Sequence, residues 1–184
     1  MKQNISSDRL AALVRQGKSG DDASLAELCA YVYGQVYAFL YYRVARVEDA
    51  EDLTSEIVLR IVRALRGQRG NFHAWMYRIA RNRLYDYYRK RAVRKEVSLH
   101  DVHEAGSVSA SDPSETVMIR ERLRKGMENL TEDQRQVIVL KFIQGHDNQE
   151  IAAMLGKSVG AIKVLQFRAL RALRDHFSRR ADEP

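Results

Sequence analysis

The chain has 184 residues, of which 45% are hydrophobic and 30% charged, and its formal net charge at pH 7 is +7. This length and composition suit one medium globular domain or two small ones. No run of 18 apolar residues is present and the start, MKQNISSDRL, lacks the apolar stretch of a secretory signal, so we expect a cytoplasmic protein. The lone cysteine, Cys29, lies in an apolar setting that predicts a buried structural thiol rather than a catalytic one.

Charge is sorted along the sequence into blocks of one sign. Residues 60–95 hold twelve arginines and lysines and one acid, Asp86, so this segment carries +11 and the rest of the chain −4. Five acids and no base lie just upstream in residues 48–56, and residues 96–116 hold five acids and no lysine or arginine. A local excess of +11 is more than solubility requires and favours a nucleic-acid partner over a merely solvated face.

The expected elements are all helices, because hairpin turn signals are absent and apolar residues recur at spacings of three and four. In the first part of the chain we expect helices through residues 10–14, 22–40, 49–65 and 72–90, the second capped by Asp21 or Asp22. The predicted fold class is all-α. We expect the chain to form two small helical domains, residues 1–95 and 117–184, joined by a flexible acidic linker at residues 96–116.

The linker and the start of the second domain have distinct signals. His100 and His103 in the linker are interpreted as solvated histidines rather than metal ligands, since no second pair lies close in sequence. The second domain is expected to begin with an amphipathic helix through Ile119, followed by a new N-cap at Thr131 and a helix that continues to Phe142.

Residues 148–173, NQEIAAMLGKSVGAIKVLQFRALRAL, have the spacing of a helix-turn-helix. Ile151 and Leu155 are predicted to face inward, Gly156 to adopt the left-handed turn, and Ser158 to cap a second helix that buries Ile162. This second helix is expected to lie in a major groove of duplex DNA. The alternative is an ordinary helical hairpin with an incidental glycine turn.

Residues 71–91, NFHAWMYRIARNRLYDYYRKR, interleave six aromatic residues with arginines. Aromatic rings stack on unpaired bases while arginine neutralises the phosphates between them, so a helix that presents both is typical of single-strand binding. Met76, Ile79, Ala80 and Leu84 are expected to turn inward. Any one aromatic residue, taken singly, is more often a packing residue than a base platform.

The order of these segments resembles that of the extracytoplasmic-function sigma factors of bacterial RNA polymerase, in their minimal form known as group 4. The resemblance rests on DAEDLTSEIVLRIVRAL, a glycine-containing loop, NFHAWMYRIARNRLYDYYRKR, an acidic linker and SVGAIKVLQFRALRAL, and it covers about residues 22–177. It implies a first domain that binds the polymerase clamp helices and opens the −10 element. It also implies a second domain that binds the flap and reads the −35 element, and an anti-sigma factor as a further partner.

The resemblance assigns roles to individual positions. Core polymerase binding falls on Asp49, Asp52, Leu53, Glu56 and Ile57. Binding of the −10 strand falls on Arg66, Asn71, Phe72, Trp75, Arg78, Arg81, Asn82 and Tyr85. Binding of the −35 duplex falls on Ser158, Gly160, Ala161, Lys163, Val164, Phe167, Arg168 and Arg171. Val164, Leu165 and Leu170 stand where the family often has polar or basic residues, which predicts a less hydrogen-bonded readout with apolar contacts to thymine methyl groups.

Two other classes of protein were weighed against this interpretation. Asp49, Asp52 and Glu56 at helical spacing resemble metal ligands of a nuclease, but no histidine or lysine pattern accompanies them. An operator-binding transcription regulator would use the helix-turn-helix alone and has no need of residues 49–91. We therefore expect a sigma factor with no catalytic residue, metal or cofactor that binds core RNA polymerase and promoter DNA.

Overall fold

The computed structural model describes residues 5–44, 46–97 and 115–181, and every regular element in these ranges is helical. The predicted all-α class is therefore confirmed for this part of the chain. Two units are distinct: one holds the residues up to Leu40 and those from Val47 to the end of the fourth helix, and the other holds Tyr41–Arg46 and the C-terminal helices. The predicted linker, with His100 and His103, lies largely outside the described residues.

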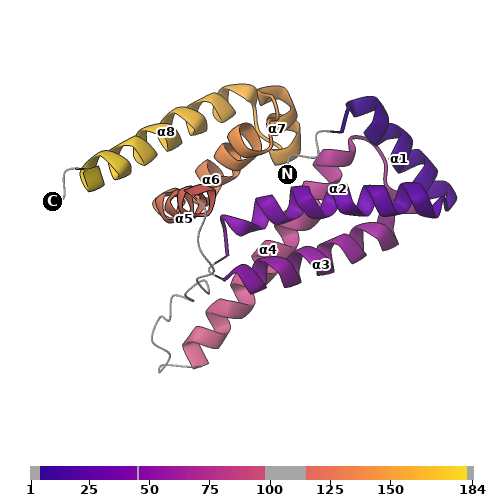
Figure 1. The fold of residues 1–184 in the computed structure, drawn as a ribbon, viewed down its shortest axis with the longest axis horizontal. Helices are drawn as coiled ribbons and strands as arrows, with labels where there is room; N and C mark the ends of the chain where they lie inside the picture. The colour runs from indigo at the N-terminus through magenta and orange to yellow at the C-terminus, as the bar shows by residue number, and fades with distance from the viewer. Residues whose placement is uncertain (1–4, 45, 98–114, 182–184) are drawn as a thin grey trace. The chain divides into compact units, whose positions relative to one another are not determined.

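The first unit contains four helices and one turn of 3-10 helix, shown in Figure 1. They are α1 (Ser7–Ser19), α2 (Asp22–Tyr41), α3 (Val47–Ala64), η1 (Leu65–Gly67) and α4 (Phe72–Val97). Ser24 donates its backbone N–H to the Asp21 carboxylate at 2.8 Å, so the expected cap of α2 is present. The predicted start of α3 at Asp49 was two residues late, and α4 continues to Val97 rather than ending near Lys90.

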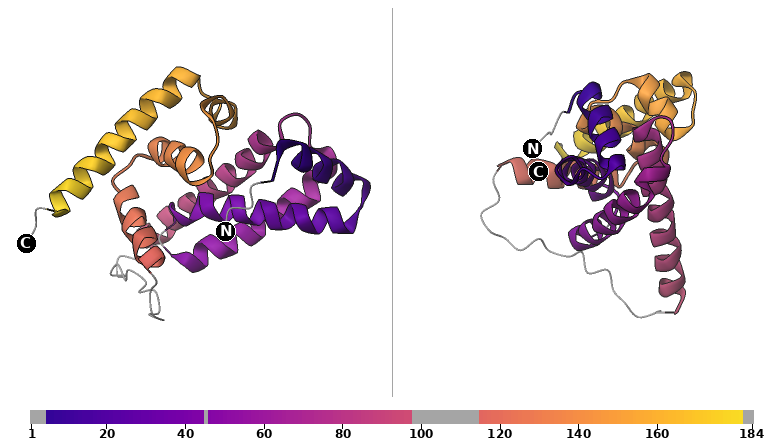
Figure 2. Two further views of the ribbon diagram at one scale, coloured as in Figure 1. Left: turned by 45° about the horizontal axis from the view of Figure 1, so that its top comes forward. Right: turned by 90° about the vertical axis from the view of Figure 1, so that its right-hand side faces the viewer.

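Apolar positions four residues apart on α3 and at the start of η1 line the core of this unit. Leu53, Ile57, Ile61 and Leu65 are 0–5% exposed, and Met76, Ala80 and Leu84 of α4 are fully buried. Ile79, also expected to turn inward, is only half-buried. Figure 2 shows that α4 extends past the end of α3, so part of its surface is left without a neighbouring helix of its unit.

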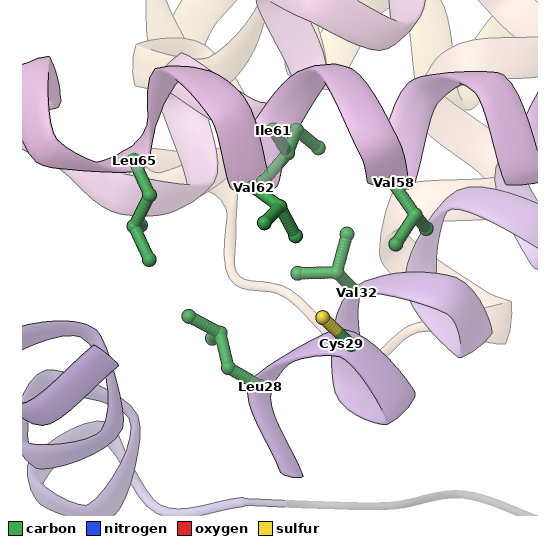
Figure 3. A pocket seen from close by; sticks show the side chains of 7 residues that line it. All are labelled: Leu28, Cys29, Val32, Val58, Ile61, Val62 and Leu65. Carbon is green, nitrogen blue, oxygen red and sulfur yellow. The ribbon is translucent and has the colours of Figure 1, made fainter. Parts of the chain in front are cut away.

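Cys29 lies in a narrow apolar crevice between α2 and α3, too tight for a water molecule. In Figure 3, Leu28, Cys29 and Val32 of α2 lie across from Val58 and Val62 of α3. Burial raises the pKa of the Cys29 thiol, because desolvation disfavours the thiolate. A raised pKa makes the thiol less readily ionised and less nucleophilic, as suits a structural role, although Cys29 is half-buried rather than buried as predicted.

The second unit is built from α5 (Glu115–Met127), α6 (Glu132–Ile138), η2 (Val139–Ile143), α7 (Asn148–Leu155) and α8 (Val159–Ala181). Thr131 caps α6 in a reciprocal capping box with Gln134, as the sequence predicts. The helix does not continue regularly to Phe142, because residues 139–143 form a π-helical segment. The wider turn changes the phase of the side chains that follow, and Phe142 is 51% exposed.

The core of the second unit gathers Met127, Leu130, Ile138, Val139, Ala169 and Leu173, together with Tyr42. Gly126 permits a close approach of the Phe177 ring, since a Cβ added there would lie 2.6 Å from Cζ of Phe177. The long helix α8 packs against α6 and α7, and its N-terminal part carries the second helix of the predicted helix-turn-helix (Figure 1).

Candidate nucleic-acid and partner surfaces

Two acids predicted to contact a partner are engaged by α4. The Tyr87 hydroxyl donates to Oδ2 of Asp49 at 2.7 Å, and the Arg91 guanidinium lies 3.8 Å from the same oxygen. Nε of Arg83 donates to Oε2 of Glu56 at 2.6 Å. Burial and the hydrogen bond to Asp49 raise the pKa of Tyr87, so this hydroxyl remains a donor. Asp49 and Glu56 therefore join α3 to the basic helix.

The exposed ridge of α3 consists of Asp52, Glu56 and Leu59, which follow the helical spacing of four and three residues. Leu59 is 55% exposed, whereas Leu53 and Ile57, predicted as polymerase contacts, are 5% and 0% exposed. The side chains of Leu53 and Ile57 are therefore part of the core and support α3 from its buried side. Leu59 was not predicted as a contact residue. It lies two positions from both Ile57 and Ile61, and a step of two residues leads to the opposite face of a helix, so its exposure follows from the sequence.

The loop before α4 ends at Asn71, which caps this helix. Oδ1 of Asn71 accepts the backbone N–H of Ala74 at 2.9 Å. The side-chain oxygen of Asn71 is thus occupied by the helix cap, and the side-chain NH₂ group of Asn71 is the end suited to donate to a ligand. Phe72 is 9% exposed and its ring lies 5.8 Å from that of Trp75, which is half-buried.

An exposed stripe on α4 continues from this loop. Arg78, Asn82, Tyr85 and Arg89 are all exposed, at spacings of four, three and four residues that place them on one side of the helix. Tyr85 is 49% exposed, whereas Tyr77 is 1% exposed and donates its hydroxyl to Gln35 at 3.2 Å. Arg81 is half-buried beside the stripe. Among the aromatic residues of α4, Phe72 and Tyr77 are therefore buried packing residues, Trp75, Tyr87 and Tyr88 are half-buried, and Tyr85 is exposed.

The helix-turn-helix has the local structure that its sequence predicts. Asp147 caps α7 by accepting the N–H groups of Gln149 and Glu150, each at 2.8 Å, and Glu150 accepts the N–H of Asp147 at 2.9 Å. Gly156 has φ +65°, and Oγ of Ser158 accepts the N–H of Ala161 at 3.2 Å.

The core contacts of this motif also agree with the prediction. Ile151 and Ile162 are fully buried and Leu155 is 6% exposed. Nε2 of Gln166 donates to Oδ1 of Asn148 at 2.8 Å, which ties α8 to the start of α7.

His146, two residues before the start of α7, is a buried titratable group within this motif. It is 8% exposed, and its Nδ1 lies 3.4 Å from Oε2 of Glu150. Desolvation lowers the pKa of His146, although the Glu150 and Asp147 carboxylates oppose the shift.

The outer face of α8 mixes cationic and apolar side chains. The exposed residues are Gly160, Lys163, Val164, Phe167, Arg168, Leu170 and Arg171, with Ser158 exposed just before the helix and Ala161 half-buried. Phe167 is 69% exposed, more than any other large hydrophobic residue described here. The residues predicted to contact the −35 element thus lie together on the N-terminal part of α8.

Other kinds of site find less support in the described part of the chain. Residues 5–44, 46–97 and 115–181 contain no group of three histidine, cysteine or carboxylate side chains able to hold a metal ion. Within the same ranges no helix combines the length and the apolar character needed to cross a bilayer.

A helical unit with a basic, aromatic-bearing helix and a second unit ending in a helix-turn-helix define the architecture of a sigma factor. Residues 28–94 match the family model for Sigma-70 region 2, and residues 120–173 match that for Sigma-70, region 4. The SigF factor of Caulobacter vibrioides is 32% identical over 95% of this chain and 96% of its own length. This chain belongs to the ECF RNA polymerase sigma factors.

Other relatives agree with this assignment. The sigma-E factor of Escherichia coli is 31% identical over 88% of this chain and 90% of its own length. BldN of Streptomyces coelicolor is 35% identical over 91% of this chain, which spans only 65% of the BldN sequence.

Solved structures share the fold. CnrH, solved in complex with the cytosolic domain of CnrY, has a TM-score of 0.69 and 26% identity over 97% of this chain and 100% of its own. The sigma factor RpoE of Bartonella quintana, in complex with the anti-sigma factor NepR, has a TM-score of 0.70 and 23% identity over 83% of this chain and 96% of its own.

Proposed function

We propose that this chain is a group 4 sigma factor that binds core RNA polymerase in the cytoplasm and directs promoter-specific initiation. The observation that carries the proposal is the presence, in one chain, of an exposed cationic and aromatic stripe on α4 and an exposed recognition face on α8. The first suits a melted strand and the second suits a duplex. The factor itself carries out no catalytic step and needs no cofactor.

In this proposal α8 reads the −35 element in the major groove. Lys163, Arg168 and Arg171 contact phosphates or guanine edges, while Val164 and Phe167 contact thymine methyl groups. Gly160 lets the backbone approach the DNA closely, since an added Cβ would have only Oγ of Ser158 near it, at 4.0 Å. Ser158, whose Oγ accepts the N–H of Ala161, and Ala161 lie at the end of α8 that enters the groove and contact the DNA there.

The −10 element is held as a single strand by the loop 66–72 and the stripe on α4. Arg66, Arg78 and Arg81 neutralise phosphates, Tyr85 and Trp75 stack on bases, and Asn82 lies on the same exposed stripe. The NH₂ group of Asn71 donates to an acceptor of a flipped base, and buried Phe72 fixes the start of the helix. Unstacking a base costs a few kcal/mol, which these contacts offset.

Core polymerase is bound through the exposed ridge of α3, where the carboxylate of Asp52 meets a basic surface of the clamp helices and Leu59 supplies apolar contact. Asp49 and Glu56 accept hydrogen bonds from α4 and use their remaining lone pairs to accept hydrogen bonds from polymerase. Leu53 and Ile57 support the ridge from the core. The second domain binds the flap. We also propose an anti-sigma factor as a partner, as the family resemblance implies.

Transcription from fragmented genomic DNA by core polymerase, with and without this protein, tests the proposal when start sites are sequenced. Protein-dependent starts that share two spaced upstream elements are the expected result. Stable binding to core without such starts would indicate an auxiliary polymerase-binding protein. No binding to core, together with tight binding to duplex sites, would favour the operator-binding regulator instead.

A further inference from the structure

The loop 66–72 is tied to α1 by a buried amide. Gln68 is 3% exposed, and its Nε2 donates to the main-chain oxygen of Gly70 at 2.7 Å. Nζ of Lys18, at the end of α1, donates to both the main-chain oxygen and Oε1 of Gln68, each at 2.7 Å. The side chain of Gln68, 50 residues away in sequence from Lys18, therefore bridges the Lys18 ammonium and Gly70 in the second half of the loop.

Close packing fixes the base of the same loop. Gly17 is buried, and a Cβ added there would lie 3.3 Å from Cδ2 of Leu65, the first residue of η1. Gly70 adopts φ +71°, a left-handed conformation that favours glycine. Nη1 of Arg69 donates to the main-chain oxygens of Arg66 and Gln68, both at 3.1 Å. The main-chain oxygens of Arg66, Gln68 and Gly70 are thus each held by a side chain of the protein.

We propose that Lys18 and Gln68 are positioning residues for −10 recognition, which hold the loop 66–72 in its base-binding conformation before DNA arrives. The inference rests on the proposed function of this loop. Binding to an ordered loop avoids the entropy cost of ordering it in the complex. Lys18 also lies outside residues 28–94, the part of the chain that matches Sigma-70 region 2, so this support comes from a neighbouring helix.

The variants separate this role from general effects of charge. Lys18→Met removes the donors and keeps much of the side-chain length, whereas Lys18→Arg retains donors. Arg15→Met is the matched control, because Arg15 is an exposed cation one turn earlier on α1. Gln68→Glu keeps an acceptor for Lys18 but loses the donor to Gly70, so it breaks only the second half of the bridge.

The first measurement is amide hydrogen exchange of the full-length protein, read on peptides that cover residues 66–72. Lys18→Met and Gln68→Glu are expected to exchange about tenfold faster there, in line with the loss of one hydrogen bond to a charged or buried group. Lys18→Arg and Arg15→Met are expected to match the wild type, and peptides of α8 are expected not to change. Unchanged exchange in Lys18→Met and Gln68→Glu would overturn the proposed support of the loop.

The second measurement is promoter opening by holoenzyme on the native −10 sequence and on single-base variants of it. We expect Lys18→Met to reduce the native-to-variant ratio of opening rates about tenfold, since a mobile loop discriminates bases poorly. Arg15→Met and Lys18→Arg should keep the wild-type ratio. Faster exchange with an unchanged ratio would overturn the positioning role. Failure of the wild type to initiate at any promoter would refute the proposed function, and the exchange data would still decide whether Lys18 holds the loop.

Discussion

Asn71 combines two roles that substitution can separate. Its Oδ1 caps α4 through the N–H of Ala74 at 2.9 Å, while its NH₂ group is proposed to donate to a flipped base. Asn71→Ala removes both functions, whereas Asn71→Ser retains a hydroxyl that caps helices as well as asparagine does and is too short to replace the amide donor. Loss of the cap costs about 1 kcal/mol. For a small domain this loss lowers the melting temperature by roughly 5 °C.

Loss of a neutral hydrogen bond to the base costs about 1 kcal/mol, which slows opening roughly fivefold to tenfold. We therefore expect Asn71→Ala to be both less stable and slower to open the promoter, and Asn71→Ser to be slower with nearly wild-type stability. Calorimetry and permanganate footprinting of melted thymines measure the two quantities. Binding to the closed duplex should not change in either variant. Wild-type opening by Asn71→Ser would show that Asn71 acts only as the helix cap and would refute the proposed base contact.

Three further predictions concern the other surfaces. Lys163→Ala and Arg168→Ala should each weaken −35-dependent initiation. If the lost contact is to a phosphate, the slope of log K against log [salt] should fall in magnitude by about 0.9. An unchanged slope with an altered base preference would instead assign a contact to a base edge. Leu59→Ala should weaken binding to core polymerase by about tenfold, as for an apolar interface residue, and change the stability by less than about 0.5 kcal/mol because the side chain is 55% exposed; undiminished affinity in a core-binding titration would contradict this. For His146, burial lowers the folded-state pKa below the ordinary value of 6.5, so the unfolded chain binds the proton more readily. The stability that neutral His146 contributes is present above pH 6.5 and is lost as the pH falls toward the folded-state pKa. His146→Gln should flatten this dependence in denaturation curves between pH 7 and 5, and an equal slope in the variant would assign it to other groups.

Local signals predicted the local structure well. The caps at Thr131 and Ser158 and the left-handed Gly156 were identified from sequence, and the cap of α2 was narrowed to Asp21 or Asp22, because a cap or a turn depends on residues only a few positions apart. The π-helical segment at 139–143 was missed, since its sequence, VLKFI, contains no proline or glycine to mark a departure from the α-helix.

The candidate site was predicted less evenly than the fold. Residues were assigned to α3 and α8 by their place in a pattern, and the pattern does not say which side chains remain exposed. Leu53 and Ile57 are in the core, while Leu59 on the opposite face is available to a partner. The engagement of Glu56 by Arg83, 27 residues later, also had no sequence signal.

The sequence by itself determined the helices, their caps, the sorting of charge into blocks and the identity of the two domain types. These properties follow from the 3.6-residue period and from composition, both of which are local. Only the tertiary structure decided that Lys18 reaches Gln68 and that Tyr87 reaches Asp49. The physical reason is that such contacts depend on the angle and register at which separate helices pack, and these are set by the shape of the whole core rather than by any short segment.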